Sequence, residues 1–84
     1  MVTLKITING LSKDVDFGDS EGSLITRMLS GEKATYTKAG FFVWKANPNE
    51  LVGVRLFRKA LEVIRKTFNL TPEQEFKYMN KFIG

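Results

Sequence analysis

Positively charged side chains are the residues of this sequence whose spacing best suits a chemical task. They recur at helical intervals between Glu50 and Phe68, and we call the following five the helix ridge: Arg55, Arg58, Lys59, Arg65 and Lys66. At about 100° per residue these side chains share one sector of a helix, opposite a wide apolar arc. Cations in a row along a surface suit contact with the phosphates of a nucleic acid. The helix ridge therefore predicts phosphate binding.

A solvated face with internal ion pairs is the simpler interpretation of the ridge taken alone. Glu62 stands at helical spacing from Arg58 and Lys66, and such pairs each stabilise a helix by about 0.2–0.5 kcal/mol. Phosphate binding becomes the better interpretation only if Lys38 and Lys45, from the preceding segment, extend the ridge.

Aromatic residues are concentrated in the segment that carries those two lysines. Residues 33–38 and 41–46 predict a second β-hairpin around Ala39-Gly40, because aromatic and β-branched residues favour strands. With a two-residue loop, one face would hold Thr35, Thr37, Phe42 and Trp44. The other face would hold Ala34, Tyr36, Lys38, Phe41, Val43 and Lys45.

Either face of this hairpin offers rings that could stack on bases. With one face outward, Tyr36 and Phe41 stand beside lysines; with the other outward, Phe42 and Trp44 stand among threonines. Base stacking on aromatic side chains contributes about 1–3 kcal/mol per base. The competing expectation is that the last helix of the chain covers the second face and buries the rings as ordinary core.

The stretch from Lys38 to Trp44, KAGFFVW, resembles the aromatic strand motif of RNA-recognition motifs. The likeness covers seven residues and is out of register by one. The βαββαβ order of that family does not fit this chain, so no family, fold or site residue is taken from the resemblance.

Catalytic and metal-binding constellations are missing from the sequence. The chain has no cysteine and no histidine, so the usual thiolate and imidazole ligands are absent, and its serines lack an imidazole base. The acidic cluster of Asp14, Asp16, Asp19 and Glu21 departs from the spacing of a calcium loop, and helix capping explains it better. We expect no metal, no cofactor and no enzymatic activity.

The elements that must position these side chains begin with a β-hairpin over residues 2–17. Two alternating runs flank Asn9-Gly10, the dipeptide typical of a type I′ turn. The predicted register pairs Val2 with Phe17, Leu4 with Val15, Lys5 with Asp14, Thr7 with Ser12 and Ile8 with Leu11.

Three helices are predicted after this hairpin. The first is short, contains Leu24, Ile25, Met28 and Leu29, is capped by Ser20 or Ser23 and ends before Gly31. The long helix, residues 50–68, begins at Asn47-Pro48-Asn49-Glu50, and the last begins at Thr71-Pro72-Glu73-Gln74. Its apolar face would hold Phe76, Met79 and Ile83.

The fold class expected from these elements is α+β, in the order ββαββαα. Two hairpins would form one antiparallel sheet packed by the long helix, within a single compact domain over residues 1–84. The net charge of +4 lies mainly in the second half: residues 47–84 carry seven Lys/Arg against four Asp/Glu. No apolar run is long enough to cross a membrane, so we expect a soluble cytoplasmic protein without a membrane partner.

These features predict a non-catalytic nucleic-acid-binding protein that prefers single-stranded RNA over duplex DNA. The helix ridge, Lys38 and Lys45 would hold phosphates, and Tyr36, Phe41, Phe42 or Trp44 would stack on bases. The alternative is a small interaction protein, for example a phage-encoded inhibitor or anti-defence factor, that binds and blocks a host protein or ribonucleoprotein. A homodimer through the apolar arc of the long helix is a further possibility.

Overall fold

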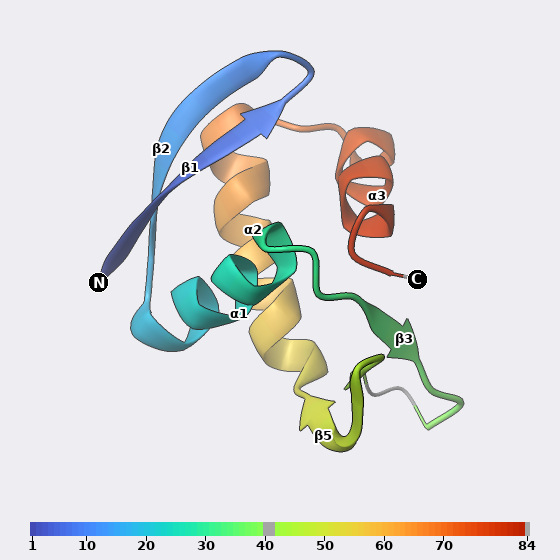
Figure 1. The fold of residues 1–84 in the computed structure, drawn as a ribbon. Coiled ribbons are helices and arrows are strands. Elements are labelled where there is room, and N and C mark those ends of the chain that lie inside the picture. Colours follow the sequence, from blue (N-terminus) through green and yellow to red (C-terminus); the bar gives the residue numbers. More distant parts are fainter. Residues whose placement is uncertain (40–41, 84) are drawn as a thin grey trace.

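The chain folds as an α+β protein with the element order ββαβββαα, which confirms the predicted fold class (Figure 1). This computed structural model describes residues 1–39 and 42–83, and within those ranges it leaves the side chains of Tyr36, Leu51 and Val52 undescribed. One strand more than expected is present, and the strands form two separate sheets.

The first hairpin has the predicted turn and the predicted register. β1 (Val2–Ile8) pairs with β2 (Leu11–Phe17) so that Ile8 lies opposite Leu11 and Val2 opposite Phe17. Asn9 and Gly10 have φ values of 52° and 79°, the two positive values that a type I′ turn requires. Alternation then places Ile6, Ile8, Val15 and Phe17 in the core.

The first helix, α1 (Asp19–Leu29), buries three of the four expected apolar residues, Leu24, Ile25 and Met28, whereas Leu29 is exposed. Its cap also differs from the prediction. Gly18 is its N-cap, and Ser20 and Ser23 lie inside the helix, so the predicted serine caps were wrong. Gly31 has a φ of 105°, which confirms it as the residue that ends the helix.

The second sheet differs from the prediction by a register shift of one residue. β3 (Ala34–Tyr36) pairs with β4 (Phe42–Trp44) so that Thr35 lies opposite Val43. A two-residue loop at Ala39-Gly40 would have placed Thr35 opposite Trp44, and a slip of one residue exchanges the faces. Ala34 therefore shares a face with Phe42 and Trp44, and all three are buried. Gly40 itself lies outside the described residues.

β5 (Asn47–Val52) occupies the segment predicted to begin the long helix. It pairs with β4 as the edge of the sheet, where Pro48 is tolerated because no ladder hydrogen bond is needed from it. The carboxylate of Glu50, expected in a capping box, instead accepts a hydrogen bond from Arg27 at 2.7 Å. α2 (Val54–Phe68) consequently starts four residues later than predicted, after Gly53.

The two sheets do not join because the C-terminal segment takes the free edge of β3. Ala34 forms a parallel bridge with Ile83, and its N–H donates to the Phe82 carbonyl at 3.0 Å. The expectation of a single antiparallel sheet was therefore wrong.

α2 lies against α1 and β2 and supplies the centre of the core (Figure 1). α3 (Pro72–Asn80) follows, and its predicted capping box is present: the Thr71 hydroxyl accepts from the Gln74 N–H, and the Gln74 side chain accepts from the Thr71 N–H. Of the predicted apolar face, Met79 and Ile83 are half-buried against the core, but Phe76 is 58% exposed and Tyr78 is buried instead. Among the described residues no helix is long and apolar enough to cross a bilayer.

Candidate nucleic-acid interface

α2 holds the helix ridge on the side that faces away from the core. Its buried residues are Phe57, Ala60, Leu61 and Ile64, which all point into the apolar cluster. Opposite them, four of the ridge side chains are exposed and Arg65 is half-buried. Burial of the apolar stripe thus fixes which way the ridge faces.

Two of the five ridge cations are engaged in ion pairs. Lys66 lies 3.0 Å from Glu62 on the same helix, and Arg65 lies 3.5 Å from Glu75 on α3. The hydrogen bond and the charge of Lys66 together lower the pKa of Glu62. The three remaining cations have no carboxylate within ion-pair distance in the described part of the chain, and we call them the unpaired ridge: Arg55, Arg58 and Lys59.

Among the described residues, a larger fraction of the carboxylates than of the cations forms ion pairs. Six of the nine Asp/Glu side chains form ion pairs, namely Asp19, Glu32, Glu50, Glu62, Glu73 and Glu75. Only four of the thirteen Lys/Arg side chains do so: Arg27, Arg65, Lys66 and Lys77. Nine Lys/Arg have no carboxylate partner among the described residues, so the positive charge of this protein is largely available to an external anion.

Carboxylates at the start of α1 border the unpaired ridge. Arg55 and Lys59 share a shallow hollow with Asp19 and Glu21, and Glu21 also lines a second hollow beside Lys59. Asp19 is engaged with the N-terminal ammonium of Met1 at 2.8 Å, and this hydrogen bond and charge lower the pKa of Asp19. Glu21 is therefore the carboxylate that most opposes a phosphate at Lys59.

The structure does not join Lys45 to the helix ridge, and no contact of Lys38 with the ridge is present among the described residues. Both are exposed, but Lys45 lies with Lys33 beside the end of α1, whereas Arg55 and Lys59 lie beside its start. α1 has eleven residues and is therefore about 16 Å long, which is roughly the separation of the two groups. The predicted continuous surface is divided into two.

Of the four rings predicted to stack on bases, two are buried. The other two are not described by the structure. Phe42 is 2% exposed and lies 4.6 Å from Phe57, centroid to centroid, and Trp44 is 3% exposed. The assignment of Phe42 and Trp44 as base-stacking residues is therefore wrong; they are core. Phe57 belongs to α2, so this face of β4 packs against that helix. The Tyr36 side chain and Phe41 lie outside the described residues.

Arg27 is a contact centre that the sequence did not indicate. Its guanidinium lies 4.0 Å from the centroid of the Trp44 ring and pairs with Glu32 at 2.9 Å and Glu50 at 2.7 Å. The hydrogen bonds that Arg27 donates to Glu32 and Glu50 raise its already high pKa. The arrangement ties α1 to β5 and covers Trp44, so it serves the fold. Nothing in the local pattern links residue 27 with residue 50.

The described residues contain no group of three or more acidic side chains placed to hold a metal ion. Comparison with protein-family models, with curated proteins and with solved structures found no match for this chain. The charges and the geometry of this chain are therefore the basis on which the candidate interface is assigned.

Proposed function

We propose that this protein is a non-catalytic, cytoplasmic nucleic-acid-binding protein that contacts the phosphate backbone through the unpaired ridge. The observation that carries the proposal is the absence of ion pairs at Arg55, Arg58 and Lys59 within the described chain. These side chains fall at helical spacings of three and four residues, so they project from neighbouring positions on one side of α2.

Single-stranded RNA is the polymer we propose as the preferred ligand. A flexible strand can follow a short ridge on a helix, whereas a rigid duplex must present its phosphates at fixed spacing. Tyr36 and Phe41 are the remaining candidates for base stacking. Phe42 and Trp44 are buried and contribute no rings to the interface.

Fluorescence anisotropy tests this function. A labelled single-stranded RNA of mixed sequence is titrated with protein at about 50 mM and about 200 mM salt, and duplex DNA of the same length competes. We expect binding that weakens steeply with salt and that the duplex competes for poorly. No binding at the lower salt concentration would end the proposal.

An exposed aromatic side chain favours a second function, that of an interaction protein which binds and blocks a macromolecular target. Phe76 is 58% exposed on α3, and large aromatics of this kind often anchor protein interfaces. A target retained by the wild type in a pull-down should then be lost by Phe76→Ser but not by Leu11→Ser, whose side chain is 53% exposed near the hairpin turn. Equal retention by both variants would exclude an interface at Phe76.

A further inference from the structure

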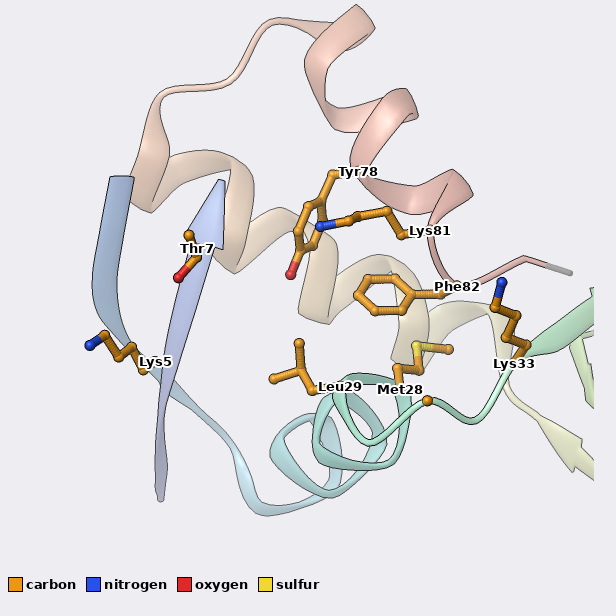
Figure 2. A pocket seen from close by; sticks show the side chains of 9 residues that line it. Lys5, Thr7, Met28, Leu29, Lys33, Tyr78, Lys81 and Phe82 are labelled. Atoms are coloured by element: carbon orange, nitrogen blue, oxygen red, sulfur yellow. The ribbon is translucent and has the colours of Figure 1, made fainter. Parts of the chain in front are cut away.

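A cavity of about 360 Å³ lies between β1, the end of α1 and the end of α3 (Figure 2). Its size is in the range of small-molecule sites. Met28 and Leu29 form one wall and Phe82 another, so much of the lining is apolar. The Phe82 wall is held in place, because its carbonyl accepts a hydrogen bond from the N–H of Ala34.

Tyr78 points its hydroxyl into this cavity without a partner. The residue is only 6% exposed, and no hydrogen bond to its hydroxyl is formed by the described residues, so the hydroxyl itself is open to solvent through the cavity. Figure 2 shows the hydroxyl directed across the cavity toward Leu29. A hydroxyl that opens into a cavity and has no partner within the described chain is free to donate to an acceptor placed there.

The free edge of β1 offers further donors on the opposite side of the cavity. In a hairpin with a two-residue loop, the residues that flank the loop form a hydrogen-bonded pair, here Ile8 and Leu11, and the pairs alternate along the strand. The backbone N–H groups of Lys5 and Thr7, together with their C=O groups, therefore point away from β2, on the edge of β1 beside the cavity that these residues line. The Lys5 side chain itself points outward (Figure 2).

Positive charge flanks the cavity, and none of the described residues that line it carries a carboxylate. Lys33 and Lys81 approach from either side of the Phe82 ring in Figure 2. The Lys81 ammonium lies 5.5 Å from the centroid of the Tyr78 ring, and neither lysine forms an ion pair within the described chain. The donors and charges of this site all suit an anion.

We propose that this cavity binds a small organic anion, in which a carboxylate or phosphate monoester is carried on a flat apolar group. The apolar group would lie against Leu29 and Phe82, and the anionic oxygens would accept from the Tyr78 hydroxyl and from Lys33 or Lys81. The site is independent of the proposed nucleic-acid interface, because it shares no residue with the unpaired ridge.

Two-dimensional amide NMR of the intact protein tests this proposal with phenylacetate and phenyl phosphate as the probes. Both should shift the amide signals of Thr7, Leu29 and Phe82 in a saturable way, with a dissociation constant of about 1 mM or lower. Phenylacetamide has the same shape without the charge, and inorganic phosphate has the charge without the ring. Each should bind at least about tenfold more weakly than its organic anion counterpart.

Matched variants locate the binding. Tyr78→Phe and Lys81→Gln should each weaken phenyl phosphate binding by about five- to tenfold. Lys77→Gln removes a charge from the same helix at a residue that does not line the cavity, and it should change the affinity by less than about twofold. A thermal melt confirms that each variant is folded, and Lys33→Gln repeats the test on an exposed side chain. Equal binding of phenylacetamide, or equal loss in Lys77→Gln, would overturn the proposal.

Discussion

At Gly22, α1 approaches β1 so closely that there is no room for one additional methyl group. A Cβ atom added there would lie 2.7 Å from the Val2 Cβ and about as close to both of its methyl groups. Gly22→Ala gains about 1 kcal/mol of helix propensity but incurs an overpacking cost of about 1–3 kcal/mol. We expect a lower free energy of unfolding in urea, and Ser23→Ala, at an exposed site of the same helix, should not lower it. A Gly22→Ala variant more stable than Ser23→Ala would contradict the packing.

Tyr78 should make the stability depend on alkaline pH. Burial raises the pKa of its hydroxyl above the ordinary value of 10.0. The unfolded chain then loses this proton at lower pH than the folded chain. The free energy of unfolding therefore falls as pH rises past about 10, and the stabilisation due to Tyr78 is fully present below about pH 10. The drop between about pH 8 and pH 11 in urea melts should be smaller in Tyr78→Phe. Lysines titrate in both proteins, so their contribution cancels in the comparison. An identical loss of unfolding free energy in the wild type and in Tyr78→Phe would contradict a stabilising effect of the buried Tyr78 hydroxyl.

Glu21 is the residue through which affinity for nucleic acid can be raised. Its carboxylate lines both hollows beside Lys59, so its negative charge repels phosphates from the unpaired ridge. Glu21→Gln should tighten RNA binding by about two- to fivefold at low salt, measured by anisotropy. Glu73→Gln changes the net charge equally but lies on α3, and it should have a smaller effect. Reversed or equal effects would place the nucleic acid elsewhere.

Among the elements, two helix caps were predicted from sequence with different outcomes: the cap of α3 was correct, and the cap of α1 was wrong. Thr71 forms both bonds of the capping box with Gln74, so Thr71→Ala should cost about 1 kcal/mol of unfolding free energy. Ser20 was predicted as a cap with equal reason but lies inside α1, so Ser20→Ala should be neutral or slightly stabilising. Thermal melts of the two variants measure this; a larger loss in Ser20→Ala would contradict the assigned caps.

Elements defined by neighbouring residues were predictable from sequence, and those defined by distant partners were not. The Asn9-Gly10 turn, the end of α1 at Gly31 and the capping box at Thr71 depend on local chemistry. β5 carries the sequence signals of a helix start, yet pairing with β4 and the bond from Arg27 to Glu50 outweigh them. The register between β3 and β4 also lacked a local signal, and so did the choice of the β4 face that packs into the core and buries Phe42 and Trp44.

For the interface, the sequence identified the cations but could not identify their partners. Position on α2 predicted that the ridge would face solvent, which the structure confirms. The pairing of Arg65 with Glu75 and the distance between Lys45 and Arg55 follow from the packing of α3 and α1, which no local pattern encodes.

At the scale of the whole molecule, uncompensated charge is the property from which function is inferred. Nine cations without carboxylate partners surround a core that holds no buried charge among the described residues. They form separate groups: the unpaired ridge on α2, and lysines around the cavity of Figure 2. If nucleic acid were attracted only by the net charge of the protein, its affinity would depend on the number of cations. If it binds at a defined site, its affinity depends on which cations are removed.

Two triple variants with the same net charge distinguish these cases most directly. Arg55→Gln, Arg58→Gln and Lys59→Gln together remove the unpaired ridge, and Lys5→Gln, Lys33→Gln and Lys81→Gln together remove the lysines of the cavity. The measurement is the slope of the logarithm of the RNA association constant against the logarithm of salt concentration. The ridge variant should flatten this slope by about 2, the value for three lost phosphate contacts to a single strand, while the cavity variant keeps most of it. Equal flattening in both variants, or none in the ridge variant, would contradict the proposed interface.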